Sequence, residues 1–120
     1  MWVVSLKRLR EFWSIHANAE VPLRGWYTQT FSADWRNLNE LRTLFPSADL
    51  VGNCIVFNVG GNKFRLIARV FYRSHKVYVL RVMTHVEYDR ADWPTECGCY
   101  SGPPVRSRRV RTTPRKRRKL

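Results

Sequence analysis

The sequence predicts an α+β domain in which two N-terminal helices pack on a small, mainly antiparallel twisted sheet, followed by a disordered basic C-terminal tail. Two stretches with helical apolar periodicity precede Pro46, and a run rich in Val, Ile, Phe and Tyr extends from Cys54 to Tyr88. The last twenty residues contain nine Lys or Arg and no apolar periodicity. The length of 120 residues suits one domain with a modest core. We therefore place the domain at residues 1–93 and the tail at residues 94–120.

The first predicted helix covers residues 2–18. Its apolar positions alternate in steps of four and three residues, which is the pattern of an amphipathic helix: Trp2, Leu6, Leu9, Trp13 and His16. Packing on the sheet of the same chain explains so broad a stripe more simply than a partner does. His16 lies at the edge of the stripe, so we expect a half-buried core histidine rather than a ligand.

Residues 20–30 are expected to form a loop, because Pro22 and Gly25 interrupt them. Trp26 and Tyr27 in this loop are expected to cap the core, and stacking on an RNA base is the alternative. A second helix is expected to start at Ser32 as its N-cap. The apolar stripe of this helix consists of Trp35, Leu38, Leu41, Leu44 and Phe45. Pro46 is expected to end the helix.

Three strands are predicted between Cys54 and Tyr88, separated by Gly60-Gly61 and by Arg73-Ser74-His75. A two-residue Gly-Gly turn would place Val59 opposite Asn62, Phe57 opposite Phe64 and Ile55 opposite Leu66. A three-residue loop at Arg73 would pair the following residues: Tyr72 with Lys76, Ile67 with Arg81, Arg65 with Met83, and Lys63 with His85. One sheet face is then apolar and includes Tyr78, Leu80, Val82 and Thr84. The other face is basic and carries Lys63, Arg65, Arg69, Arg81 and His85.

The charge of the chain predicts a polyanionic partner. The formal net charge is +13, of which +9 lies in the last twenty residues and +4 in residues 1–100. Nucleic acid is favoured over a membrane surface, because no apolar stripe accompanies the basic tail. The N-terminus lacks the apolar core of a signal peptide and no apolar run is long enough to span a bilayer, so a cytoplasmic protein is expected.

The cysteines and the other potential metal ligands predict neither a disulfide scaffold nor a metal centre. Three cysteines are too few for a disulfide framework, and structural or incidental thiols are expected. Cys97-Gly98-Cys99 has no second Cys/His pair at zinc-site spacing. The sequence also contains no HExxH motif and no paired Asp/Glu site, so we expect no metal and no cofactor.

Three segments, FPSADLVGN, FNVGGNKFRLIARV and VMTHVEYD, resemble the HigB-type toxins of bacterial type II toxin–antitoxin pairs. These toxins belong to the RelE-like superfamily of mRNA-cleaving proteins, and the resemblance covers the chain from about Met1 to Asp92. It implies a RelE-like fold and an endoribonuclease, or mRNA interferase, that cleaves mRNA on translating ribosomes and inhibits translation and growth. It also implies neutralisation by a HigA-like helix-turn-helix antitoxin. The segment around Cys97 and the PRKRRKL ending lie outside the resemblance.

RNA cleavage without a metal needs a proton-transfer group and phosphate-binding cations, since the 2′-hydroxyl of RNA can attack the adjacent phosphate. His85 is the first candidate for proton transfer, with Lys63 as the second. Tyr88 could donate to phosphate or stack on a base, and Glu87 could orient His85 or an arginine, or act as the base. Arg65 suits phosphate because its planar fork can hold two oxygens.

The expected catalytic set is therefore His85, Lys63, Arg65, Glu87 and Tyr88, and the expected RNA-binding set is Asn62, Arg69, Arg73 and Arg81. The first motif of the resemblance, GGNxxR, contains Asn62 and Arg65, with Lys63 at a position where relatives vary; the second, THxEYD, contains His85, Glu87 and Tyr88. In a plain structural reading, Arg69 and Arg73 are solvated and Asn62 only completes a turn.

Two other functions compete with the nuclease reading. The basic face could bind RNA or the ribosome without catalysis. Alternatively, a zinc-dependent protein could be built around Cys97, Cys99 and a histidine. The nuclease reading depends on the side chains of Lys63 and His85 pointing to the same face, because they must serve one site.

Overall fold

The computed structural model describes residues 1–90 and 92–100. It has the predicted α+β class, with helices at the N-terminus followed by a mixed sheet of five strands. The elements in chain order are β1 (Trp2–Val4), α1 (Leu6–Ile15), the 3-10 helix η1 (Ala17–Ala19), α2 (Glu20–Ser32), α3 (Leu38–Leu44), β2 (Asp49–Val51), β3 (Cys54–Val59), β4 (Phe64–Phe71), β5 (Lys76–Thr84), α4 (His85–Arg90) and α5 (Trp93–Glu96). Within the described residues, no helix has the length and apolar character needed to cross a bilayer.

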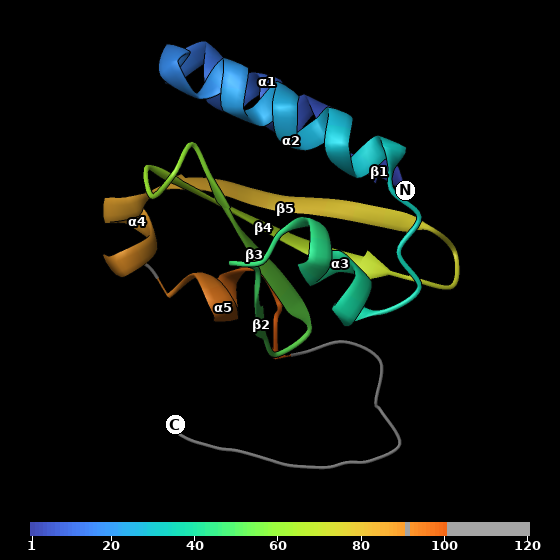
Figure 1. Ribbon diagram of the computed structural model, residues 1–120. Coiled ribbons are helices and arrows are strands. Elements are labelled where there is room, and N and C mark those ends of the chain that lie inside the picture. The colour runs from blue at the N-terminus through green and yellow to red at the C-terminus, as the bar shows by residue number, and fades with distance from the viewer. Residues whose placement is uncertain (91, 101–120) are drawn as a thin grey trace.

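The sheet has the strand order β1-β5-β4-β3-β2. β1 runs parallel to β5, and all other neighbouring strands are antiparallel. The helices α1 and α2 lie together on one side of the sheet, whereas α4 and α5 lie on its other side (Figure 1). The main core fills the space between the N-terminal helices and the sheet, and its fully buried side chains include Leu9, Leu23, Leu41, Phe57 and Leu66. Both faces of the central strands are therefore covered.

The N-terminal segment begins with a strand, so the prediction of a helix from residue 2 was wrong. β1 places Trp2 opposite Lys76 of β5, and the Trp2 side chain is 62% exposed. Ser5 takes a left-handed conformation with φ 76°, after which α1 begins at Leu6. The backbone hydrogen bonds of β1 are made with β5, which is distant in the sequence. The spacing of apolar residues within the segment therefore could not predict this strand. His16 is half-buried and stacks on Phe12, as expected.

Residues 20–32 form the helix α2, which corrects the prediction of a loop. Pro22 is the third residue of this helix, where a backbone N–H has no acceptor inside the helix, so proline costs little there. Trp26 is buried and packs edge-on against Phe57 at 5.4 Å, which confirms its expected place in the core. Tyr27 is half-buried and stacks on Phe31, with ring centroids 5.8 Å apart.

The next helix starts later than predicted. Ser32 is the last residue of α2 rather than an N-cap, and the N-cap of α3 is Asn37, whose Oδ1 accepts a hydrogen bond from the Glu40 N–H at 2.9 Å. Trp35 precedes α3 but is buried in the main core all the same. The helix ends at Leu44, two residues before the proline that was expected to stop it.

The β3–β4 register differs from the prediction by two residues. Val59 lies opposite Phe64, and Phe57 lies opposite Leu66, so residues 60–63 form a four-residue connection instead of a two-residue turn. Side chains alternate with a period of two, so a shift of two residues leaves every side chain on its predicted face.

The β4–β5 register is partly as predicted. Ile67 lies opposite Arg81 and Arg65 opposite Met83, as expected, but a bulge follows and Phe71, not Tyr72, lies opposite Lys76. Ala68 pairs with Val79, so the bulge inserts Leu80 as an extra residue and exchanges the two faces of the strand beyond it. The predicted apolar face was consequently wrong for residues 76–80. Val77 and Val79 point into the main core, whereas Tyr78 contacts Phe71 and Leu80 packs on the second, smaller core.

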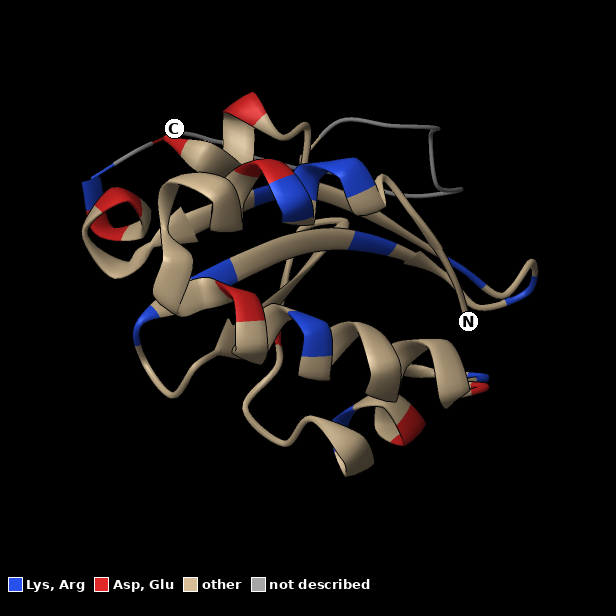
Figure 2. Cartoon of the chain, turned by 90° about the horizontal axis from the view of Figure 1, so that it is seen from above, with Lys and Arg blue, Asp and Glu red and all other residues tan. Residues whose placement is uncertain are grey.

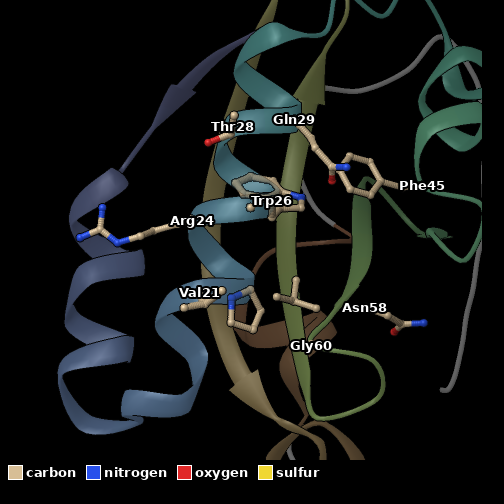
Figure 3. A pocket seen from close by; sticks show the side chains of 11 residues that line it. Val21, Arg24, Trp26, Thr28, Gln29, Phe45, Asn58 and Gly60 are labelled. Carbon is tan, nitrogen blue, oxygen red and sulfur yellow. The ribbon is translucent and has the colours of Figure 1, made fainter.

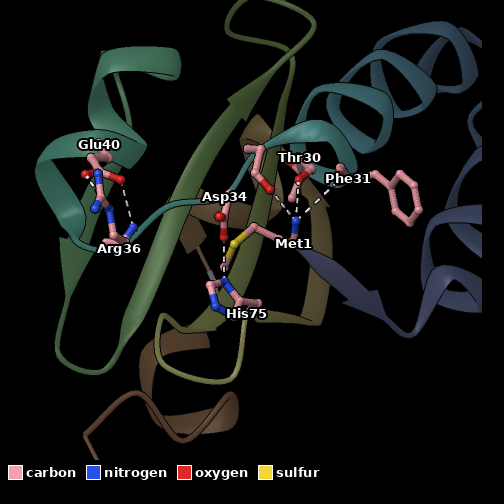
Figure 4. A network of polar contacts seen from close by, with 8 residues as sticks. Met1, Thr30, Phe31, Asp34, Arg36, Glu40 and His75 are labelled. Atoms are coloured by element: carbon pink, nitrogen blue, oxygen red, sulfur yellow. Dashed lines mark hydrogen bonds and ion pairs between the residues drawn. The ribbon is translucent and has the colours of Figure 1, made fainter.

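Polar contacts tie the first residue and the hairpin turn to the end of α2 (Figure 4). The Met1 amine donates to the carbonyl oxygens of Thr30 and Phe31, each at 3.3 Å, and to that of Ala33. A positive charge is favourable there, because the carbonyl groups at a helix C-terminus carry partial negative charge. Asp34 Oδ1 lies 2.6 Å from Nδ1 of His75 in the β4–β5 turn. These contacts hold α2 against the sheet edge formed by β1.

The folded domain continues past residue 93, where the boundary was placed, since that residue begins α5. A disulfide joins Cys54 at the start of β3 to Cys99, and the Asn53 N–H donates to the Cys99 carbonyl at 2.6 Å. The expectations of disorder from residue 94 and of three thiols were therefore wrong up to residue 100. Cys97 is a free, half-buried cysteine. The bonded cysteines are 45 residues apart, so only the tertiary fold could bring them together. The remainder of the predicted tail, residues 101–120, lies outside the described residues.

A substitution at Gly52 tests the packing of the C-terminal segment. It has φ +57°, and a Cβ atom there would lie 2.3 Å from the Cys99 carbonyl oxygen. We expect Gly52→Ala to lower the free energy of unfolding by more than about 2 kcal/mol, since backbone strain and a clash add. Gly61→Ala is the matched control, because Gly61 has φ +70° with nothing within 4 Å of the added atom. The control should lose only about 1 kcal/mol. Equal losses in urea denaturation would contradict this packing.

Candidate active site

The candidate site lies where β5 passes into α4, beside the turn that precedes β4. His85 is the first residue of α4, and its backbone N–H donates to the Lys63 carbonyl oxygen at 3.0 Å. The backbones of these two residues are therefore adjacent, as predicted, and the placement of their side chains at one site stays a prediction. Lys63 lies in the turn rather than in the strand, and the side chains of both residues are exposed. One backbone hydrogen bond thus joins the two sequence motifs.

Asp89 is a polar neighbour of His85 that the sequence reasoning missed. Its Oδ2 atom lies 3.0 Å from Nδ1 of His85, one helical turn earlier. A carboxylate that pairs with Nδ1 orients the imidazole ring, and Nε2 is then free to contact a substrate. Residues 85–88 had been read as the end of a strand, in which positions 85 and 89 are too far apart to touch. A helical reading would have shown the spacing of four residues.

Glu87 serves as a helix cap, which none of its predicted roles included. The Thr84 N–H donates to Glu87 Oε1 at 2.9 Å, and the Glu87 N–H donates to Thr84 Oγ1 at 3.2 Å. This reciprocal pair is a capping box, and it starts α4 directly after β5. The carboxylate of Glu87 is turned toward the Thr84 backbone, so capping accounts for its place in the THxEYD motif.

Arg65, Tyr88 and Trp93 form a layered stack beside His85. The Arg65 guanidinium carbon lies 5.2 Å from the Tyr88 ring centroid, and Tyr88 stacks on the buried Trp93 at 5.1 Å. Arg65 Nη1 also donates to the carbonyl oxygens of Asn62 and Phe64, at 3.2 and 3.3 Å. Burial raises the pKa of the Tyr88 phenol, and the Arg65 charge offsets this only partly. The phenol is therefore a neutral hydrogen-bond donor at neutral pH.

The other predicted RNA-binding arginines do not join this cluster. Arg81 forms an ion pair with Glu96 of α5. Arg69 lies over the Phe71 ring at 5.2 Å, and Arg73 is exposed in the turn at the far end of β4. An eight-residue strand is roughly 26 Å long, so Arg73 is too distant to serve the same phosphate as His85. Positions of Lys and Arg are spread over helices, strands and turns (Figure 2).

The prediction of one open basic sheet face was wrong. Ile67 and Met83, which were assigned to that face, are fully buried. They belong to a second hydrophobic cluster, which consists of Cys54, Val56, Ile67, Met83, Trp93 and Cys99. The C-terminal segment supplies two of these residues and so covers the middle of the face. The structure thus groups Asn62, Lys63, Arg65, His85, Glu87 and Tyr88 at one end of the sheet.

The structure also bears on the zinc alternative. Cys99 is bonded to Cys54 and is not available as a thiolate ligand. Among residues 1–90 and 92–100, no three His, Cys, Asp or Glu side chains come close enough together to hold a metal ion.

A groove of about 730 Å³ lies between α2 and the end of β3, with Phe45 at its side (Figure 3). Its wall is mainly apolar and is formed by Val21, Pro22, Arg24, Gly25, Trp26, Thr28, Gln29, Phe45, Asn58, Val59 and Gly60. No histidine or carboxylate lines it, so it offers no group for proton transfer near neutral pH.

Substitutions of Glu87 distinguish its role as a helix cap from a role as general base. Glutamine also caps, so we expect Glu87→Gln to keep both stability and activity near the unaltered level. Glu87→Ala should lose about 1 kcal/mol of unfolding free energy, because the Thr84 N–H loses its acceptor. If Glu87 were instead the general base, Glu87→Gln would lower RNA cleavage about a hundredfold or more. Urea denaturation and a cleavage assay on both variants decide between the two roles.

Comparison with known proteins identifies the family of the chain. A family model described as HigB_toxin, the RelE-like toxic component of a toxin–antitoxin system, matches residues 19–91. The mRNA interferase toxin HigB of Escherichia coli (strain K12) is 50% identical over 52 residues, which are 41% of this chain and 50% of that protein. The mRNA interferase HigB of Escherichia coli O6:H1 is 28% identical over 93 residues, or 75% of this chain and 90% of that protein. The match to the K12 protein thus spans about half of its length. Because the family model covers more than half of the 120 residues, the chain belongs to the HigB family of RelE-like toxins.

Proposed function

We propose that this protein is the toxin of a type II toxin–antitoxin pair and that it cleaves mRNA without a metal ion. One observation carries the proposal: the hydrogen bond between His85 N–H and the Lys63 carbonyl joins the GGNxxR and THxEYD motifs. It brings a proton-transfer group, two cations and a phenol to one end of the sheet. The names of the relatives, mRNA interferases of Escherichia coli, support the same substrate.

The chemistry that we propose uses the nucleophile of RNA itself. The 2′-hydroxyl attacks the adjacent phosphate in line, and the 5′-oxygen of the next nucleotide leaves. Nε2 of His85 transfers a proton while Asp89 holds Nδ1. Arg65 and Lys63 stabilise the charge that builds on the phosphate, and the neutral phenol of Tyr88 donates a further hydrogen bond.

The exposure of the cluster supports a role for the ribosome. His85 and Lys63 are exposed, and an exposed site by itself does little to hold a flexible RNA strand in line. A ribosome that already positions a codon would supply this orientation, which is the costly part of such a reaction. We therefore propose cleavage of mRNA on translating ribosomes in the cytoplasm, with inhibition of translation and growth, and control by a HigA-like helix-turn-helix antitoxin.

A non-catalytic RNA- or ribosome-binding module is the second candidate. The same exposed cations would grip phosphates without chemistry, and binding would fall steeply with salt. Glu87 favours this candidate, because its carboxylate caps α4 and so has a structural role. The appearance of new 5′-hydroxyl ends on translated mRNA distinguishes the two.

Single substitutions test the site. We expect His85→Ala and Arg65→Ala to abolish growth arrest in cells that lack the antitoxin and to lower cleavage about a hundredfold or more, because each removes a group that acts in the transition state. Arg73→Ala is the matched control, since Arg73 is an exposed cation at the far end of the hairpin. Growth after induction and mapping of 5′-hydroxyl ends are the measurements. Retained toxicity in both site variants, with folding shown by circular dichroism, would exclude this site.

A further inference from the structure

The C-terminal segment, residues 93–100, crosses the sheet face beside the candidate site. Trp93 stacks on Tyr88 with its side chain 5% exposed, and the carboxylate of Glu96 pairs with Arg81. At its far end Cys99 is buried and bonded to Cys54. The segment therefore lies over two side chains that were expected to bind RNA.

The position of residues 93–100 over these side chains opposes RNA binding. Tyr88 cannot stack on a base through the ring face that Trp93 occupies. Arg81 is neutralised by Glu96, and a carboxylate at this position repels an approaching phosphate. Removing the segment would add one cation and one aromatic surface to the site.

Apart from the burial of Trp93 and the hydrogen bond from the Asn53 N–H to the Cys99 carbonyl, the noncovalent contacts of the segment are weak. α5 has four residues, which is too short for a helix to be stable by itself. The ion pair between Arg81 and Glu96 is solvent-exposed, with Glu96 56% exposed, and such pairs contribute little. The disulfide is the covalent link that fastens residues 93–100 to β3.

We propose that the Cys54–Cys99 disulfide is a reversible redox site, and that a dithiol reductant releases residues 93–100 and opens the RNA site. Cys54 and Cys99 are both buried, so the reductant's first thiolate reaches one of the two sulfurs only when residues 93–100 open locally, and it then forms a mixed disulfide. Its second thiol then closes the reductant's own disulfide, and Cys54 and Cys99 are left as two thiols. Two electrons and two protons pass to the protein. A cell compartment that keeps thiols reduced thus favours the open form. The opening of the RNA site rests on the proposed function, whereas the redox step does not.

Cys97 is a free thiol of the same chain that does not readily exchange with the disulfide. It packs beside the second cluster, and burial raises the pKa of its thiol, with Arg81 offsetting part of the shift. The thiol form therefore dominates at neutral pH, and only the thiolate attacks disulfides. Exchange of Cys97 into the disulfide is accordingly slow, and opening needs an external dithiol.

The test uses the full chain, oxidised or treated with dithiothreitol without oxygen. Free thiols, counted after denaturation, should rise from one to three, since Cys97 is free and the other two cysteines are bonded. The amides of residues 96, 97, 98 and 99 donate hydrogen bonds to the carbonyl oxygens of Asp92, Trp93, Thr95 and Pro94, respectively. These amides should lose protection from hydrogen exchange on reduction. The amides of β4 and β5 should keep their protection. Binding of a short single-stranded RNA should become more salt-dependent, by about 0.7 in the log–log slope, because Arg81 gains one phosphate.

Three variants sharpen the test. Cys97→Ser keeps the disulfide and should respond to the reductant as the unaltered chain does. Cys99→Ser should resemble the reduced protein without any reductant. Glu96→Gln frees Arg81 while the disulfide remains, so it should reproduce the change in salt slope but not the loss of amide protection.

The outcomes separate this proposal from the nuclease proposal. Protection of residues 96–99 that survives full reduction would overturn the redox site, whatever the protein does to RNA. Loss of protection in β4 and β5 at the same time would also overturn it, since the disulfide would then be purely structural. Release of the segment with an unchanged salt slope would overturn the opening of the RNA site. Release with the steeper slope supports the proposal even where no RNA is cleaved, and that result would count only against the nuclease.

Discussion

The pairing of β4 with β5 is the interaction on which the rest of the structure depends. Its register places Arg65 opposite Met83 and brings the Lys63 carbonyl to the His85 N–H. The bulge at Leu80 then exchanges the faces of β5, so Val77 and Val79 reach the main core while Met83 reaches the second one. A regular ladder would have directed one end of β5 away from the helices. The bulge therefore allows one strand to serve two cores.

Coverage of both sheet faces limits where chemistry can take place. The N-terminal helices bury one face, and α5 with the disulfide buries the middle of the other. The polar side chains of the two motifs lie at the sheet end, where the turn before β4 meets α4. The capping box of Thr84 and Glu87 is what turns the chain into α4 there. That turn places His85 and Asp89 on the same helical surface, and it stacks Tyr88 between Arg65 and Trp93.

The His85 and Lys63 side chains are exposed, and this exposure connects the proposed function with the proposed regulation. An exposed group of cations gains little from desolvation, so an ordered substrate must supply much of the orientation. For the same reason a short covering segment can change what the site binds. Glu96 and Trp93 need only occupy Arg81 and one face of Tyr88 to alter its charge and its aromatic surface.

Much of the fold was predictable from the sequence, because its signals are local. Val, Ile and Phe in alternation indicated β3, β4 and β5, and the pairs Ile67–Arg81 and Arg65–Met83 followed from matching both faces. The residues of the candidate site were also largely predictable, since the GGNxxR and THxEYD motifs are short and specific. Local signals misled where a residue's effect depends on its position in an element. Pro22 was read as a breaker, although it stands in the first turn of α2 where proline is tolerated.

The sequence by itself determined the α+β class, the three long strands and the residues that meet at the sheet end. Only the tertiary structure decided the parallel strand β1, the bulge at Leu80, the His85–Asp89 contact and the Cys54–Cys99 bond. The physical reason is the range over which each interaction acts. Apolar periodicity and turn chemistry act between near neighbours and can be read along the chain. Strand pairing and a disulfide across 45 residues arise only once the chain has folded, and they decide which polar side chains remain exposed.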